Sequence, residues 1–162
     1  MTGLLTGALA VLAAMAADPD ESARIAETYL AAYEDQDFAA METLYAETAI
    51  FVDPTSFDVA PITGPIEWQG RAAILDGIAG WGVERLHYDI DRTFSASGRT
   101  VFDGEVTVTY ALADGERQYR FPIVTIVTVS GGHVVEHRDY TDYAGMERVT
   151  PSTGTGPQGE QN

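Results

Sequence analysis

The second half of the chain alternates apolar and polar residues over four long stretches, and this pattern constrains the fold more than any other feature. The stretches are residues 86–94, 100–111, 118–129 and 133–143. A period of two is typical of β-strands that bury one face. Asp114-Gly115 and Gly131-Gly132 are turn signals between neighbouring stretches. We therefore expect these strands to pair antiparallel.

The first half of the chain has helical spacing instead. Helices are predicted from about Ala23, with Asp20 or Ser22 as the N-cap, after Asp37, and over about residues 72–80. A short apolar strand is expected at 49–52, followed by a loop over 54–67. Helices gathered on one side of a curved antiparallel sheet make an α+β fold, and such a sheet, closed at one end by three helices, leaves a pocket between the layers.

The two ends of the chain differ from this pattern. Residues 1–17 contain no charged side chain, are short for a membrane span, and end near Ala14-Met15-Ala16, a small-x-small cleavage pattern. We expect a secretory signal over 1–17 and an exported protein, periplasmic or secreted. The alternative is a packed N-terminal helix in a cytoplasmic protein. Residues 18–149 are then the domain, and the Pro-, Ser-, Thr- and Gly-rich residues 150–162 a disordered tail.

The charge balance limits the partners. The chain has 25 acidic and nine basic residues, a formal net charge of −16. Such a surface repels nucleic-acid phosphates and anionic lipid heads, so we expect neither nucleic acid nor membrane as a partner. We interpret the acidity as a contribution to solubility, with a site that attracts cations as the alternative.

Several kinds of site are excluded by residue type and spacing. The chain has no cysteine, which excludes disulfides, thiolate catalysis and cysteine-ligated metals. His87, His133 and His137 lack the spacing of a metal site, and no nucleotide-binding glycine motif is present. We therefore expect no metal, no other cofactor, and a small molecule as the ligand.

Four segments carry a resemblance to a known family. They are YLAAY at 29–33 with DQD at 35–37, YAETAIFVDP at 45–54, WQGRAAI at 68–74 and GHVVEHRDYTDY at 132–143. In order and spacing they resemble the nuclear transport factor 2-like superfamily, in particular its SnoaL-like branch, over residues 22–148. The resemblance implies a cone-shaped sheet around a ligand cavity and a homodimer formed through the outer face of the sheet. It does not imply one function, because this fold hosts enzymes and binding modules alike.

The enzyme relatives imply candidate catalytic residues. By resemblance to ketosteroid isomerases, Asp53 falls at the catalytic base and Tyr29 at the oxyanion-hole tyrosine, while Val124 replaces the aspartic acid that completes that hole. By resemblance to limonene epoxide hydrolases, Asp139 falls at an essential acid, but Glu105 and Thr107 stand near the other two triad positions. The polyketide cyclases of the SnoaL-like branch use an acid/base residue near His137 or Asp139.

The residues themselves leave alternatives open. In a strand, Val135, His137 and Asp139 share one face, so His137 and Asp139 are a candidate acid/base pair. The alternative is that His137 is a packed core residue. Asp53 precedes a proline and is a candidate base if buried, or a simple turn starter.

The pocket lining and the function follow from the same placement. The residues expected to line the pocket are Tyr33, Phe51, Trp68, Trp81, Val124 and Ile126, with plain core packing as the alternative for the tyrosine and tryptophans. One hypothesis is a cofactor-free enzyme for a small apolar molecule, with Asp139 or Asp53 as the base, His137 as its partner and Tyr29 as a donor. The other is a module that binds a ligand or a partner without chemistry.

Overall fold

The computed structural model describes residues 19–56 and 65–149, so the expected signal segment and tail lie outside the described residues. The helices are α1 (Pro19–Glu34), α2 (Phe38–Leu44), α3 (Arg71–Gly80) and a 3-10 turn at Tyr143–Gly145. The strands are β1 (Tyr45–Asp53), β2 (Ile66–Gln69), β3 (Arg85–Ala96), β4 (Arg99–Leu112), β5 (Gly115–Ser130), β6 (His133–Thr141) and β7 (Glu147–Val149).

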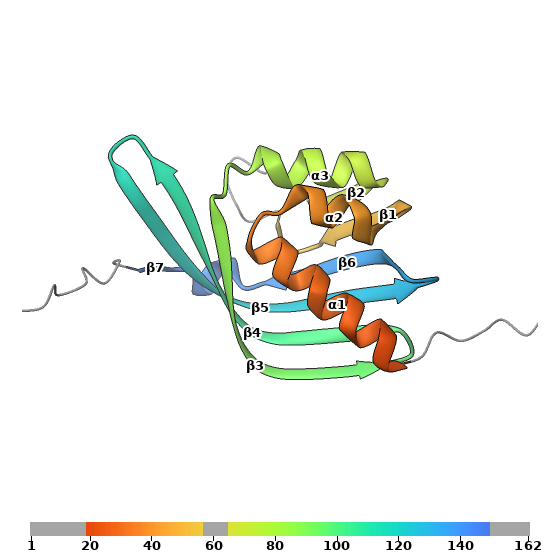
Figure 1. The fold of residues 1–162 in the computed structure, drawn as a ribbon. Coiled ribbons are helices and arrows are strands. Elements are labelled where there is room, and N and C mark those ends of the chain that lie inside the picture. The colour runs from red at the N-terminus through yellow and green to blue at the C-terminus, as the bar shows by residue number, and fades with distance from the viewer. Residues whose placement is uncertain (1–18, 57–64, 150–162) are drawn as a thin grey trace, which may run out of the picture.

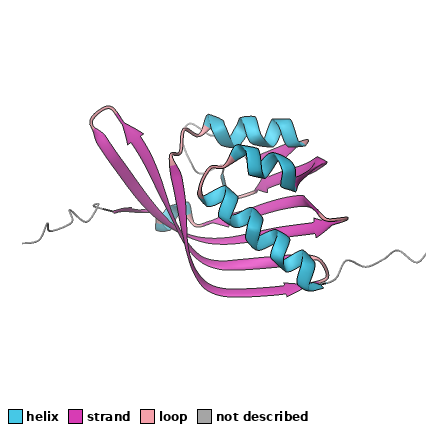
Figure 2. Ribbon diagram, in the orientation of Figure 1, coloured by secondary structure: helices cyan, strands magenta, loops and turns pink. Residues whose placement is uncertain are grey.

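The strands form one curved sheet, and the helices cover its concave side (Figures 1 and 2). The strand order is β2-β1-β6-β5-β4-β3, with β7 paired to β5. α1 crosses this sheet and packs on β3, β4, β5 and β6, while α3 packs on β1 and β2. The predicted α+β architecture of three helices closing a curved sheet is therefore confirmed.

Three details of the sheet differ from the sequence prediction. β1 pairs with β6 in parallel, whereas every other pairing is antiparallel. β2 and β7 were not predicted, because each is short and β2 follows a segment rich in proline. The parallel pair places the C-terminal ends of β1 and β6 side by side, and these ends carry Asp53 and Asp139.

The helix caps agree with the sequence in one of two cases. The Asp37 carboxylate accepts a hydrogen bond from the Ala40 N–H at 3.0 Å and so caps α2. α1 begins at Pro19, before Asp20 and Ser22, so the predicted cap at either residue is wrong, and Ser22 is buried. Proline suits the first turn of a helix because the N–H it lacks would have no partner there.

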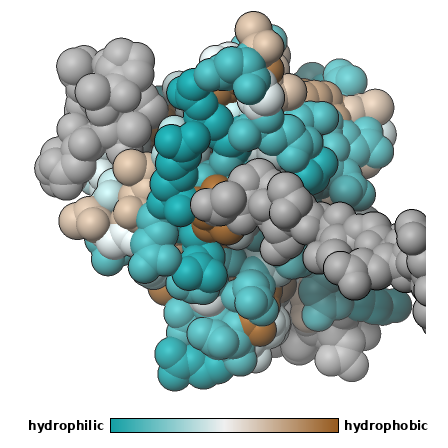
Figure 3. Space-filling view, turned by 90° about the vertical axis from the view of Figure 1, so that its left-hand side faces the viewer, coloured by the Kyte–Doolittle hydropathy of each residue, from teal (hydrophilic) through white to brown (hydrophobic). Residues whose placement is uncertain are grey.

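The surface agrees with the composition. The face in Figure 3 is mostly hydrophilic, and its hydrophobic areas are small and separate. None of the helices in the described part of the chain is both long and apolar enough to cross a membrane.

A β-bulge in β6 sets which of its side chains point inward. Val129 pairs with Val134 and Thr128 pairs with Glu136, so Val135 is an extra residue opposite β5. Val134 is therefore buried together with His137 and Asp139. The expectation that Val135 shares their face is wrong, because the extra residue shifts the alternation by one position.

Aromatic packing between α3 and the sheet requires a glycine. The Trp68 ring stacks on Phe51, with centroids 5.2 Å apart, and lies 5.5 Å from the Trp81 centroid. A Cβ atom on Gly77 would lie 2.6 Å from three carbons of the Trp68 ring. Only glycine lets the helix approach the indole this closely.

Gly77→Ala is therefore expected to lower the free energy of unfolding by about 1–3 kcal/mol, the usual cost of overpacking, measured by urea denaturation. Gly80→Ala in the same helix is the matched control, since a Cβ there meets nothing within 4 Å. The control should be neutral or gain up to about 1 kcal/mol from helix propensity. Equal stability of the two variants would show that Trp68 does not depend on Gly77.

Candidate functional site

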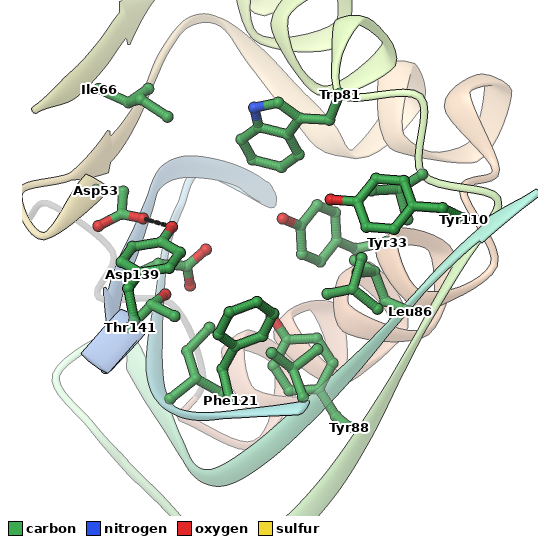
Figure 4. Close-up of a pocket in the computed structure, with 15 residues that line it drawn as sticks. Tyr33, Asp53, Ile66, Trp81, Leu86, Tyr88, Tyr110, Phe121, Asp139 and Thr141 are labelled. Atoms are coloured by element: carbon green, nitrogen blue, oxygen red, sulfur yellow. Dashed lines mark hydrogen bonds between the residues drawn. The ribbon is translucent and has the colours of Figure 1, made fainter. Parts of the chain in front are cut away.

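A partly open cavity of about 140 Å³ lies between the concave face of the sheet and the helices (Figure 4). Its aliphatic wall consists of Ile66, Val83, Leu86, Val106, Val108 and Ile123. Its aromatic wall consists of Tyr33, Trp81, Tyr88, Tyr110, Phe121 and Tyr143. Asp53, Asp139 and Thr141 supply the other polar groups. A lining of this kind, apolar with a few converging polar groups, is typical of a small-molecule site.

Asp139 presents one bonded and one open oxygen. Its Oδ1 accepts hydrogen bonds from the Thr125 hydroxyl at 2.6 Å and from His137 Nε2 at 2.9 Å. Its Oδ2 makes no hydrogen bond with the described residues, and the carboxylate is turned toward the cavity in Figure 4. The two hydrogen bonds hold the side chain in place, and the residue is only 4% exposed. Asp139 can therefore accept a proton or a hydrogen bond from a ligand without moving.

A line of buried donors stands behind Asp139. His137 has no exposed surface, and its Nδ1 lies 2.5 Å from the Tyr29 hydroxyl. The Tyr29 hydroxyl is also hydrogen-bonded to the Tyr45 hydroxyl. The rings of Tyr33 and Phe51 pack edge-on against the imidazole, with centroids 4.9 and 4.6 Å away. This packing leaves the imidazole no room to turn.

One arrangement of protons satisfies the whole line. The carboxylate accepts, so Nε2 carries the hydrogen and Nδ1 of a neutral imidazole accepts from Tyr29. Tyr29 then accepts from Tyr45. A protonated imidazole would donate from Nδ1 to Tyr29, and Tyr29 would then donate to Tyr45. The Tyr45 hydrogen would be left without an acceptor among the described residues. The geometry therefore favours neutral His137, with every donor directed toward Asp139.

The tyrosines around the cavity are hydrogen-bond donors rather than phenolates. Burial raises the pKa of Tyr29, Tyr33 and Tyr88 well above the usual 10.0. Burial also raises the pKa of Tyr45 and Tyr143, and the hydrogen bond to Asp53 adds to the shift at Tyr143. A phenolate here would lose its hydration and face the charge of the nearby aspartates.

Both carboxylate oxygens of Asp53 accept hydrogen bonds from other groups of the protein. Its Oδ1 accepts from the Thr55 N–H at 2.9 Å and the Thr55 hydroxyl at 2.5 Å, and its Oδ2 accepts from the Tyr143 hydroxyl at 2.7 Å. The Thr55 hydroxyl in turn accepts from the Thr141 N–H at 2.9 Å. These bonds tie the end of β1 to the end of β6. Asp53 thus contributes its charge and a rigid rim, while its oxygens already have partners.

The structure brings some predicted site residues to the cavity and places others behind it. Asp53, Asp139, Tyr33 and Trp81 are lining residues. The remaining catalytic candidates, His137 and Tyr29, are fully buried and absent from the lining. Tyr29 therefore meets His137 and Tyr45 instead of the ligand.

Four residues expected in the lining lie elsewhere. Phe51 and Trp68 pack against each other, with Trp81 beside both, in a layer behind the cavity. Val124 and Ile126 lie on the opposite face of β5, because Ile123 and Thr125 are the buried positions. The outer face where Val124 and Ile126 lie is the one predicted to form a homodimer, and that association stays a prediction.

Sequence reasoning missed several members of the site. Tyr45, Thr125 and Tyr143 hold His137, Asp139 and Asp53 through hydroxyl groups. The only sequence signal for Thr125 was its place opposite Asp139 in the paired strand, and register is needed to see it. Among the described residues, no cluster of His, Asp or Glu has the arrangement of a metal site.

Tyr29→Phe tests the buried line of donors. The variant leaves His137 Nδ1 without its donor and Tyr45 without its partner, each at about 1–3 kcal/mol. We expect a matching fall in the free energy of unfolding by urea denaturation. Tyr110→Phe is the control, since its hydroxyl makes no hydrogen bond with the described residues, and should change stability by less than about 0.5 kcal/mol. Strict additivity of Tyr29→Phe with Tyr45→Phe would contradict the proposed bond.

Alkaline titration tests the burial of the tyrosines. Because their folded pKa values lie above the unfolded value of 10.0, stability is complete below about pH 10 and falls above it. Each such tyrosine then removes about 1.4 kcal/mol of stability per pH unit. Tyrosinate absorbance should appear together with loss of circular dichroism. Ionisation of all tyrosines near pH 10 in a folded chain would contradict the burial.

Comparisons with known proteins agree with this fold. The family model for the SnoaL-like domain matches residues 26–137. No curated protein is significantly similar to the chain in sequence. A structure described as a SnoaL-like polyketide cyclase from Shewanella putrefaciens superposes with a TM-score of 0.65 at 22% identity, covering 88% of this chain and 94% of that one.

Two further structures have the same fold. A ketosteroid isomerase, so described, from Kribbella flavida has a TM-score of 0.59 at 18% identity, covering 90% of this chain and 92% of that chain. An epoxide hydrolase of the limonene type from M. tuberculosis has a TM-score of 0.58 at 14% identity. The match covers 76% of this chain and 84% of that chain. At these identities the likeness shows the fold, and the family match over most of the chain shows that the protein belongs to the SnoaL-like domain family.

Proposed function

We propose that this protein is a cofactor-independent enzyme that moves a proton on a small, largely apolar molecule, with Asp139 as the general base. One observation carries the proposal. Asp139 Oδ1 is fixed by His137 and Thr125, while Oδ2 is open to a cavity with apolar walls. A carboxylate with one oxygen fixed and the other facing the ligand is placed for general-base catalysis.

His137 is the positioning residue in this scheme. Its Nε2–H holds Oδ1, so the proton from the substrate arrives at Oδ2. The base takes the proton from a carbon next to a carbonyl, and the C–H electron pair moves into the carbonyl to form an enolate. In a substrate with a neighbouring β,γ double bond, the enolate electrons return through that double bond, which shifts to the α,β position, and Asp139 gives the proton to the γ-carbon. The result is an isomerisation with no net gain or loss of protons.

Tyr33 is suited to meet the enolate oxygen. Its hydroxyl is turned into the cavity in Figure 4 and makes no hydrogen bond with the described residues. Burial keeps its pKa well above 10.0, so the group donates rather than ionises. A donor already in place where negative charge develops lowers the barrier of such a reaction. Tyr33 thus takes the role that resemblance gave to Tyr29.

A second candidate function is ligand binding without chemistry. It is favoured by Asp53, the residue at the resemblance-derived base position, whose oxygens already accept three hydrogen bonds. An occupied carboxylate of this kind stabilises the rim and takes no proton from a ligand. The two functions differ in whether Asp139 turns over a substrate.

Deuterium exchange distinguishes the two functions. Cyclohexanone suits the cavity, since a void of about 150 Å³ holds benzene. In D2O the full chain should accelerate the exchange of the α-hydrogens of cyclohexanone above the rate in buffer alone. NMR measures this exchange. Asp139→Asn keeps the Oδ1 contacts and should reduce the rate by about 100-fold or more. The exposed Asp76→Asn is the charge-matched control and should exchange like the wild type.

Either of two results would contradict the enzyme proposal. One is equal exchange by wild type and Asp139→Asn. The other is saturable binding of cyclohexanone, seen by the fluorescence of Trp68 and Trp81 together, without acceleration of exchange above buffer. The second result is the one that the binding function predicts.

A further inference from the structure

The charges that line the cavity are all of one sign. Asp53 and Asp139 are lining residues, and none of the described lining residues is lysine, arginine or histidine. His137 is hydrogen-bonded to Asp139 from the side away from the cavity, and the hydrogen-bond pattern favours its neutral form. The other donors to the two carboxylates are hydroxyls and one backbone N–H. The negative charge of the cavity is therefore hydrogen-bonded but not neutralised.

The aromatic wall faces the same space. Six rings line the cavity: Tyr33, Trp81, Tyr88, Tyr110, Phe121 and Tyr143. Figure 4 shows Tyr33 and Tyr110 across the cavity from Asp139 and Asp53, with Trp81 at the top between the two sides. The faces of aromatic rings attract cations, and this attraction grows when water is excluded. Rings on one side and carboxylates on the other act on a positive charge in the same direction.

The open oxygen of Asp139 discriminates between ligands. A neutral ligand offers Oδ2 no charge contact in place of the water that it displaces. An anion would be repelled by both carboxylates. A cation replaces the lost water with a direct charge contact. The net charge of −16 also raises the local concentration of cations near the cavity.

We propose that the ligand of this cavity is a small organic ammonium ion, with its charged nitrogen between Asp139 and the aromatic wall. The inference rests on the proposed function only in using the same cavity. It adds the chemical class of the ligand to the binding function, because an ammonium nitrogen at Asp139 Oδ2 occupies the oxygen that would otherwise act as the base. Asp139 Oδ2 makes the direct contact, and Asp53 acts through its charge because its oxygens are occupied. The carbon part of the ligand packs against the aliphatic wall.

A pair of probes of equal shape tests the charge. Choline and 3,3-dimethylbutan-1-ol differ in that a quaternary nitrogen replaces a carbon. Both are titrated into the full chain by calorimetry at low salt. Choline should bind at least about tenfold more tightly, since a contact worth 1.4 kcal/mol changes the affinity tenfold. Added salt should weaken the binding of choline and leave the affinity for the alcohol unchanged.

Three variants locate the effect. Asp53→Asn keeps the size of the side chain, and the new amide can donate to the Tyr143 hydroxyl, so a hydrogen bond between these two residues is kept. This variant should bind choline about tenfold more weakly and bind the alcohol with unchanged affinity. Trp81→Leu should also weaken choline more than the alcohol. Asp76→Asn removes the same charge from an exposed position and should change neither affinity.

The outcomes separate this inference from the proposed function. Equal binding of the two probes, or no binding of choline, would overturn the ammonium ligand and leave the exchange experiment to decide catalysis. A choline preference that Asp76→Asn abolishes as strongly as Asp53→Asn would also overturn it, since the attraction would then be general. A preference confined to the cavity variants supports the inference, even if Asp139 catalyses no exchange.

Discussion

The hydrogen bond between His137 and Asp139 is the interaction on which the site depends. Both residues lie on β6, which is paired on one side with β1 and on the other with β5. A carboxylate in this position must be paired, because a buried charge without partners is costly. His137 and Thr125 supply the partners for one oxygen, and Tyr29 and Tyr45 keep the imidazole in the form that can donate. Helix α1 is thereby linked to β1 and β6 by polar contacts as well as by packing.

The two aspartates at the cavity differ in what surrounds them. Asp53 lies at a turn, where backbone and hydroxyl donors gather around it, and it joins the ends of two strands. Asp139 lies within a strand, where its neighbours can reach only one oxygen. The carboxylate of Asp53 therefore links two strand ends, whereas the carboxylate of Asp139 has an oxygen that a ligand can reach. Local backbone conformation, and not residue type, decides which role each carboxylate can fill.

Much of the fold could be predicted from the sequence, because periodicity is a property of single segments. The three helices, the Asp37 cap and the four long strands all follow from local patterns. The facing of β5 could not be predicted, since Ile123 and Val124 are both apolar and alternation alone does not say which points inward. The direction of the Tyr29 hydroxyl could not be predicted either, because it depends on Tyr45 and His137, which are distant in the chain.

The bulge at Val135 has a consequence for how such a site could arise or be lost. With regular pairing beyond Val134, the inward positions would be Glu136 and Arg138, which form an ion pair with a nitrogen–oxygen distance of 2.6 Å on the other face. The bulge therefore places the imidazole of His137 and the carboxylate of Asp139 inside the cone and leaves the ion pair on the outer face. Regular or bulged pairing of this one strand decides which of the two pairs faces the interior, while every side chain on the strand stays the same.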